Sequence, residues 1–81
     1  MDLENVKSHK VLDTRGLTYP MQLCKIETAL RDIPRGNILE IWDLDPDSKK
    51  EIPALARGQN NEYLGSIDDP EGYSRYFIKK G

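Results

Sequence analysis

Hydrophobic residues recur in the first half of the chain with the spacing of one helix face. The stripe consists of Leu23, Ile26, Leu30 and Ile33. Steps of three and four residues keep such positions on one side of an α-helix. Pro20 suits the first helical position, where a missing N–H costs nothing, and residues 34–36 end the pattern with Pro and Gly. The sequence therefore predicts a helix that begins at Pro20 and ends before residue 34.

Residues 37–43 have a different periodicity, in which successive side chains alternate between the two faces of a strand. Leu39 and Ile41 point one way, whereas Ile38, Glu40 and Trp42 point the other way. The charge of Glu40 indicates that the second face is the wetter one. We therefore expect a strand whose Leu39 face packs on the core.

The remaining segments complete the set of predicted elements. Residues 9–13 predict a short strand, and residues 47–58 predict a helix with Pro53 in or near its first turn. The buried side of this second helix is expected to hold Ile52, Leu55 and Ala56. Residues 62–67 and 73–80 predict two strands that pair as a hairpin across the turn-forming loop DDPEG.

The order of these elements, β-α-β-α-β-β, predicts the fold class. Two helices and four strands in so short a chain fit an α+β, two-layer α/β sandwich. In this arrangement, a four-stranded mixed sheet carries both helices on one face. The chain has 81 residues, so we expect one domain spanning residues 1–81, with a polar and flexible segment at residues 1–7.

Composition narrows the function classes. The formal net charge is −2, which argues against a strongly basic footprint for nucleic acid. One cysteine and one histidine exclude the usual zinc sites, so no metal site is expected. No apolar run approaches the roughly 20 residues of a membrane span, and no signal segment opens the chain. We expect a cytoplasmic monomer without membrane contact.

Cys24, the only cysteine of the chain, is one candidate for chemistry. On a helix that begins at Pro20, Cys24 lies about 100° from Leu23, on the side away from the apolar stripe. It also lies more than one turn into the helix, where the N-terminal N–H groups no longer activate a thiol. Cys24 is therefore expected at the edge of the buried face or outside it, as either an ordinary or a working thiol.

Tyr19 is the second candidate because it stands directly before the predicted helix start. A helix N-terminus offers free N–H groups and the positive end of the helix dipole. A cysteine there would be a good nucleophile, whereas a phenol cannot carry sulfur. Two interpretations remain open: Tyr19 covers the end of the core, or it contacts a ligand or partner.

Other polar residues are assigned to the surface. The acidic residues Asp43, Asp45 and Asp47 lack the glycine and the distant glutamate of a calcium loop, and predict a helix entrance and a solvated turn. His9 has no obvious partner and is expected on the surface. The scattered basic side chains are also expected in solvent: Arg15, Lys25, Arg31, Arg35, Lys49, Lys50 and Arg57.

Three stretches of the sequence follow a known pattern. Residues 12–23, LDTRGLTYPMQL, are similar to a signature that reads roughly L-D-x-x-G-L-x-C-P-x-P. Residues 36–53, GNILEIWDLDPDSKKEIP, are similar to G-x-x-L-x-[IV]-x-x-D-D-P followed by D-I-P. Residues 74–81, SRYFIKKG, are similar to an ending of the type YRYLIRKG. Together they resemble the TusA/SirA-like sulfur-carrier family over almost the whole chain past residue 8.

The resemblance implies a sulfur relay. Family members carry sulfur as a persulfide on the cysteine of the C-P-x-P motif, without a metal or organic cofactor. They receive the sulfur from a cysteine desulfurase or another sulfurtransferase. They pass it toward tRNA thiolation, molybdenum-cofactor enzymes or sulfur oxidation. The matching residues are Leu12, Asp13, Gly16, Leu17, Pro20, Leu39, Ile41, Asp45, Pro46, Ile52 and Pro53.

The sequence departs from the family at the functional positions. The family cysteine falls on Tyr19, the second proline of the motif falls on Gln22, and a further cysteine of some members falls near Ala56. Cys24 lies about 140° around the helix and about 7.5 Å along it from the acceptor position, so it is not a shifted copy of the acceptor.

Three functional hypotheses follow from the resemblance and its departures. In the first, the protein is a binding or regulatory member that contacts a desulfurase, a sulfurtransferase or an acceptor enzyme without carrying a persulfide. Its binding surface would consist of Arg15, Gly16, Leu17, Thr18, Tyr19, Pro20 and Gln22. In the second, Cys24 is a relocated sulfur acceptor. In the third, the domain binds RNA, as the similar C-terminal domain of translation initiation factor three does, with Trp42 stacking on a base.

Overall fold

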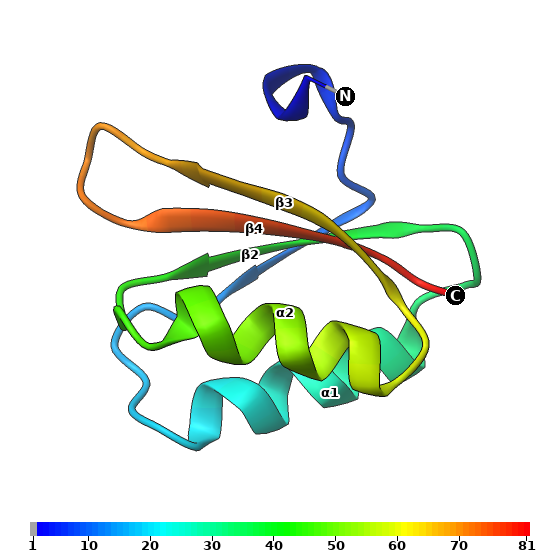
Figure 1. The fold of residues 1–81 in the computed structure, drawn as a ribbon, viewed down its shortest axis with the longest axis horizontal. Helices are drawn as coiled ribbons and strands as arrows, with labels where there is room; N and C mark the ends of the chain where they lie inside the picture. Colours follow the sequence, from blue (N-terminus) through cyan, green and yellow to red (C-terminus); the bar gives the residue numbers. More distant parts are fainter. Residues whose placement is uncertain (1) are drawn as a thin grey trace.

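The polypeptide forms two layers in the computed structural model, which describes residues 2–81. In chain order the elements are η1 (Leu3–Asn5, a 3-10 helix), β1 (Lys10–Asp13), α1 (Met21–Asp32), β2 (Ile38–Asp43), α2 (Ser48–Gly58), β3 (Glu62–Asp68) and β4 (Ser74–Lys79). Both helices lie on one side of the sheet, and the N-terminal segment lies on the other side (Figure 1). The predicted element order and two-layer α+β architecture are confirmed.

The sheet is mixed, with the strand order β1-β2-β4-β3. β1 pairs with β2 in parallel, and Leu12 lies opposite Ile41. β4 pairs antiparallel with both β2 and β3, so the predicted hairpin is present. Because β1 and β2 are parallel, the loops that follow them leave the sheet at the same edge. This edge, at the left of Figure 1, brings the starts of both helices together.

The core lies between the sheet and the helices. The predicted stripe on α1 is largely confirmed, because Ile26, Leu30 and Ile33 are buried and Leu23 packs against them. The Leu39 face of β2 is buried as well. Further buried side chains of α1, β2, α2 and β4 complete this cluster: Ala29, Ile41, Ile52, Ala56, Tyr76 and Ile78.

The prediction that the second face of β2 is the wetter one is wrong at Glu40. Glu40 is only 5% exposed. Its carboxylate accepts hydrogen bonds from Trp42 Nε1 at 2.6 Å and Ser8 Oγ at 2.9 Å. It also accepts one from Arg75 Nε at 3.0 Å. Ser8 and Arg75 come from distant parts of the sequence, so the alternation within β2 carries no signal of their approach.

α2 begins at the buried Ser48, and Pro53 lies inside it near its first turn, as predicted. The expectation for His9 is corrected. His9 has a partner, since its Nδ1 accepts the backbone N–H of Ile38 at 2.9 Å. It therefore ties the start of β1 to β2.

The N-terminal segment folds onto the outer face of the sheet. The side chain of Leu3 fills the space beside Gly65 in β3, where an added Cβ would lie 2.8 Å from Leu3 Cδ1. The expected flexibility of residues 1–7 concerns motion and stays a prediction, and Met1 lies outside the described residues. Within residues 2–81, neither helix is long and apolar enough to cross a membrane.

Candidate functional site

The loop between β1 and α1 begins with a tight turn that is anchored to the sheet. Thr14 is fully buried, and both its N–H and its hydroxyl donate to Trp42 O, at 2.9 and 2.6 Å. Leu17 N then donates to Thr14 O at 3.0 Å, which closes a turn over residues 14–17. Gly16 has a φ of 92°, in the region that favours glycine. Gly16 is therefore required by the backbone of this turn.

A second turn follows at once and presents Tyr19. Met21 N donates to Thr18 O at 2.8 Å, so Tyr19 and Pro20 occupy the centre of this turn, with a cis peptide bond between them. Pro20 caps α1 from outside, and the helix begins one residue later than predicted, at Met21. Tyr19 is 62% exposed. The interpretation that Tyr19 covers the end of the core is therefore wrong.

The first turn of α1 is linked to the loop that follows β2. Gln22 Nε2 donates to Asp45 Oδ2 at 3.0 Å. Gln22 is only 1% exposed, and its Oε1 has no hydrogen-bond partner within the described part of the chain. The bond fixes the β2–α2 loop beside the start of α1.

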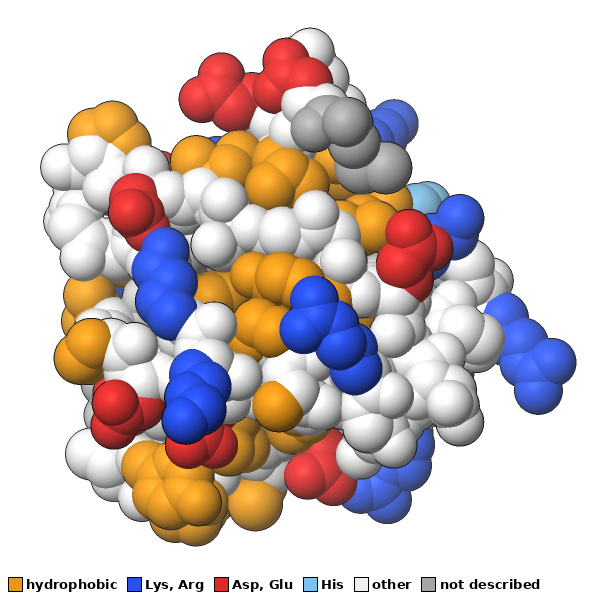
Figure 2. All heavy atoms as spheres, in the orientation of Figure 1, with side chains coloured by type: hydrophobic (Ala, Val, Ile, Leu, Met, Phe, Trp, Pro, Cys, Tyr) orange, Lys and Arg blue, Asp and Glu red, His pale blue; other side chains and the backbone are white. Residues whose placement is uncertain are grey.

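Exposed apolar side chains gather on these two adjoining loops. We call the set Leu17, Tyr19, Met21 and Leu44 the loop patch; its members are 37%, 62%, 49% and 57% exposed. Met21 and Leu44 each directly precede a partner of the Gln22–Asp45 bond. Hydrophobic side chains are visible at the lower left of Figure 2, over the start of α1, and farther up the same edge. Neighbouring exposed apolar residues of this kind are typical of protein interaction sites.

The predicted site residues lie in one region but differ in exposure. Leu17, Thr18, Tyr19 and Pro20 are all exposed on the two turns. Gln22 is buried beneath them, and Arg15 turns its side chain onto the aromatic rings of Trp42 and Tyr73. The sequence analysis missed Met21 and Leu44. Leu44 could have been predicted from a parallel pairing of β1 and β2, because this pairing places Leu44 at the same edge of the sheet as the β1–α1 loop.

Cys24 lies on the exposed side of α1, which confirms the expected position outside the buried face. Its backbone N–H donates to Pro20 O at 3.2 Å, within the first turn of the helix. The prediction that Cys24 lies more than one turn into the helix is therefore wrong, because α1 begins at Met21 rather than at Pro20. The Thr28 hydroxyl donates to Cys24 O at 3.1 Å, so the nearest described polar contact involves the backbone rather than the thiol. The thiol is accessible and lies one helical turn behind Met21.

The acidic turn is less solvated than predicted. Asp43 is 3% exposed and accepts hydrogen bonds from the Ser48 hydroxyl and from Leu44 N, the latter at 2.8 Å. Asp45 Oδ1 accepts Asp47 N at 3.0 Å. These carboxylates therefore bind N–H groups of the loop that leads into α2, and Asp43 also binds the hydroxyl of its first residue, Ser48. Within residues 2–81, no group of three or more His, Cys, Asp or Glu side chains has the arrangement of a metal site.

Trp42, the proposed RNA-stacking residue, is engaged by its neighbours. The guanidinium carbon of Arg15 lies 5.0 Å from its ring centroid. Tyr73 packs beside it, with ring centroids 5.3 Å apart and an angle of 44° between the planes. Its Nε1 is bound to Glu40. A base that stacked on Trp42 would have to displace the side chain of Arg15.

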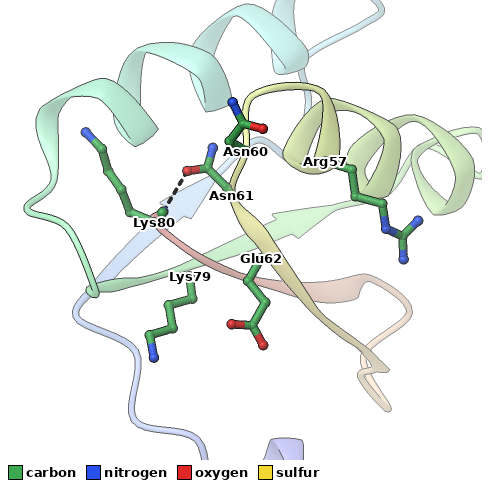
Figure 3. Close-up of a pocket in the computed structure, with 7 residues that line it drawn as sticks. Arg57, Asn60, Asn61, Glu62, Lys79 and Lys80 are labelled. Carbon is green, nitrogen blue, oxygen red and sulfur yellow. Dashed lines mark hydrogen bonds between the residues drawn. The ribbon is translucent and has the colours of Figure 1, made fainter.

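A hollow lies at the other end of the molecule. It has a volume of about 470 Å³ and is lined by the end of α2, the start of β3 and the end of β4. Figure 3 shows that its basic side chains Arg57, Lys79 and Lys80 point in different directions. Lys80 Nζ donates to Arg31 O at 2.9 Å, and Arg57 lies over the ring of Tyr63 at 5.5 Å. The cationic groups do not converge on a common point.

The amino-acid sequence matches a known protein family and several of its members. The family model for sulfurtransferase TusA matches residues 10–80. YrkF of Bacillus subtilis is 36% identical over 76 residues, which cover 94% of this chain but only 40% of YrkF. The sulfur carrier protein TusA of Pseudomonas savastanoi pv. phaseolicola is 28% identical over 78 residues, covering 96% of this chain and 92% of the relative.

A crystal structure of another protein shows the same fold. The SirA-like protein of Desulfitobacterium hafniense superposes with a TM-score of 0.79, covering 89% of this chain and 97% of the other. The sequence identity of the pair is 15%, so this likeness shows the fold alone. The family model, in contrast, matches nearly the whole chain, including both turns of the β1–α1 loop. The chain belongs to the TusA family of sulfur-relay proteins.

Proposed function

We propose that this chain is a binding or regulatory member of its family, which docks onto a protein of a sulfur-transfer pathway and carries no persulfide itself. The observation that carries the proposal is Tyr19. It stands where the family motif places the acceptor cysteine, and it is 62% exposed at the centre of a turn. In this proposal the two turns are kept for docking, while the phenol of Tyr19 cannot accept sulfur.

The loop patch supplies the contact surface in this proposal. Its four apolar side chains come from the first residue of α1 and from the two loops beside it, and a partly buried hydrogen bond joins the first turn of α1 to the β2–α2 loop. Large, preformed apolar anchors such as Tyr19 lose little conformational freedom on binding, and they account for much of the affinity of protein interfaces. The partner is a cysteine desulfurase, a sulfurtransferase or an acceptor enzyme.

Calorimetric titration of the purified chain into these three enzyme classes tests the proposal. A family relative that carries the motif cysteine serves as the positive control. We expect Tyr19→Ala to weaken binding by about 30-fold, the loss typical of an interface hot spot. Leu44→Ser is expected to weaken binding as well. Its matched control is Val11→Ser, which alters an aliphatic side chain of similar exposure, 45% against 57%, on β1.

Binding to none of the enzymes, under conditions in which the cysteine-bearing relative binds, would overturn the proposal. Equal losses in Leu44→Ser and Val11→Ser would move the contact surface away from the loop patch.

The exposure of Cys24 favours a second candidate function, in which this thiol accepts sulfur. Incubation with a desulfurase and cysteine would then add one sulfur atom to the chain, and Cys24→Ser would abolish the addition. An unchanged intact mass excludes this candidate. The RNA-binding hypothesis gains no support from Trp42, because Arg15 and Tyr73 pack against its ring.

A further inference from the structure

Arg15 is held from several sides at the beginning of the β1–α1 loop. Its guanidinium donates to Asp13 through two parallel bonds, Nε to Oδ1 at 2.9 Å and Nη2 to Oδ2 at 2.8 Å. Its backbone N–H donates to Asp13 Oδ1 at 3.0 Å. The guanidinium carbon lies 4.6 Å from the ring centroid of Tyr73 and 5.0 Å from that of Trp42. Both distances are within the range of cation–π attraction.

The residues around Arg15 come from three strands or their ends. Asp13 ends β1, Trp42 is its neighbour in the register of β2, and Tyr73 directly precedes β4. Tyr73 is only 9% exposed although it lies outside a strand. The guanidinium of Arg15 therefore packs against the two aromatic rings beside the loop.

Arg15 is also a central residue of the turn that leads to the loop patch. Thr14 is bound to the sheet, and Leu17 N closes the turn on Thr14 O. Beyond Leu17, the next backbone bond on the path is that of Met21 N to Thr18 O. The orientation of Leu17 and Tyr19 therefore depends on how firmly the first turn is held.

We propose that Trp42 and Tyr73 are positioning residues of the docking surface: their rings hold Arg15, and Arg15 fixes the turn from which Leu17 and Tyr19 project. This inference deepens the proposed function and rests on it for its consequence in binding. A turn that is held before the encounter loses less conformational entropy on binding, so affinity is higher. The rings contact the loop from the sheet side and lie outside the loop patch.

Amide hydrogen exchange tests the positioning role without a partner. We expect Tyr73→Leu to increase the exchange rate at Leu17 by about tenfold, because the turn opens locally more often. Exchange at Ile41 and Ile78 in the sheet centre is expected to stay unchanged. Tyr73→Phe keeps the ring and should retain the slow exchange, which separates the ring from the hydroxyl group.

A matched control uses the tyrosine–arginine contact at the other end of the molecule. Tyr63→Leu removes the ring over which Arg57 lies at 5.5 Å, and it should leave exchange at Leu17 unchanged. Arg15→Met removes the guanidinium at an exposed position and should also increase the exchange rate at Leu17 by about tenfold. This variant keeps the test possible if Tyr73→Leu fails to fold. Unchanged exchange at Leu17 in Arg15→Met would overturn the proposal, as would fast exchange in Tyr73→Phe.

Binding gives the second readout. With whichever sulfur-transfer enzyme the wild-type chain binds, Tyr73→Leu should lower the affinity by about tenfold and Tyr73→Phe should not. If the wild-type chain binds none of them, the proposed function fails, while the exchange experiment still decides the positioning role. Equal affinities of Tyr73→Leu and wild type, with faster exchange at Leu17, would overturn the link between the turn and binding.

Discussion

Gln22 Nε2 donates a hydrogen bond to Asp45 Oδ2 at 3.0 Å, and this partly buried bond joins the start of α1 to the β2–α2 loop, the two segments on either side of the loop patch. In the C-P-x-P motif that residues 12–23 resemble, the second proline falls on Gln22. Proline could not make this bond because it lacks a side-chain donor. The chain therefore links the start of α1 to the β2–α2 loop through a polar contact.

The Gln22 bond predicts a graded loss of stability on substitution. Gln22→Ala removes the bond and leaves a cavity, so it should lower the free energy of unfolding by about 1–3 kcal/mol. Gln22→Met keeps the volume and also removes Oε1, which has no partner within residues 2–81. We expect a smaller loss for Gln22→Met than for Gln22→Ala in urea unfolding. Both variants remove the bond to Asp45, so equal losses would show that this bond, rather than packing, dominates at this site. A larger loss for Gln22→Met would contradict the prediction.

A pair of glycine substitutions tests the first turn of the loop. Gly16 has a φ of 92°, so Gly16→Ala should cost about 1–2 kcal/mol through backbone strain alone, with nothing within 4 Å of the added Cβ. Gly58 also has open space around its Cβ position but ends α2 without a positive φ. Gly58→Ala should therefore stabilise the chain by about 0.4–1 kcal/mol. Thermal unfolding of both variants checks the opposite signs.

Glu40 predicts an acid-sensitive contribution to stability. Burial pushes the pKa of this carboxyl up, but hydrogen bonds from three neighbouring side chains, led by Arg75, outweigh burial and hold the pKa below its ordinary value of 4.5. A depressed folded-state pKa stabilises the fold above the unfolded-state value. This stabilisation is lost as the pH falls through the folded-state pKa.

The variant Glu40→Gln isolates that contribution. We expect its free energy of unfolding to fall less steeply than that of wild type as the pH is lowered from about 6 to about 3. At neutral pH it should be less stable by about 1–3 kcal/mol, because the hydrogen bond from Arg75 loses its charged acceptor. Glu62→Gln, at an exposed position of β3, is the matched control and should keep the wild-type slope. A wild-type slope in Glu40→Gln would contradict the assignment.

Local patterns predicted the elements of this fold because each pattern reports on a nearby surface. The apolar spacing on α1 identified its buried side, and the alternation in β2 identified Leu39 and Ile41 as core residues. The same patterns failed at Glu40 and Gln22, where a polar residue is buried. Two of the three partners of Glu40, Ser8 and Arg75, lie 32 and 35 residues away, and Asp45 lies 23 residues from Gln22. Spacing within one element carries no information about such distant partners.

The candidate site was predicted along one loop but not across two. Leu17 and Tyr19 lie within the motif of residues 12–23, so the resemblance pointed to them directly. Leu44 joins them only because β1 and β2 are parallel and end at the same edge of the sheet. Tyr73 reaches Arg15 from the start of β4, on the far side of β2 in the strand order. The sheet topology, rather than any motif, assembles this part of the site.

Native mass spectrometry of the chain mixed with a cysteine desulfurase and cysteine tests the central claim most directly, because one spectrum reports both docking and sulfur transfer. We predict a complex of the two proteins in which the chain keeps its own mass, and a Tyr19→Cys variant that gains the mass of one sulfur atom. A wild-type chain that gains sulfur would contradict the account. So would the absence of a complex with the desulfurase, if the chain also forms none with a sulfurtransferase or an acceptor enzyme.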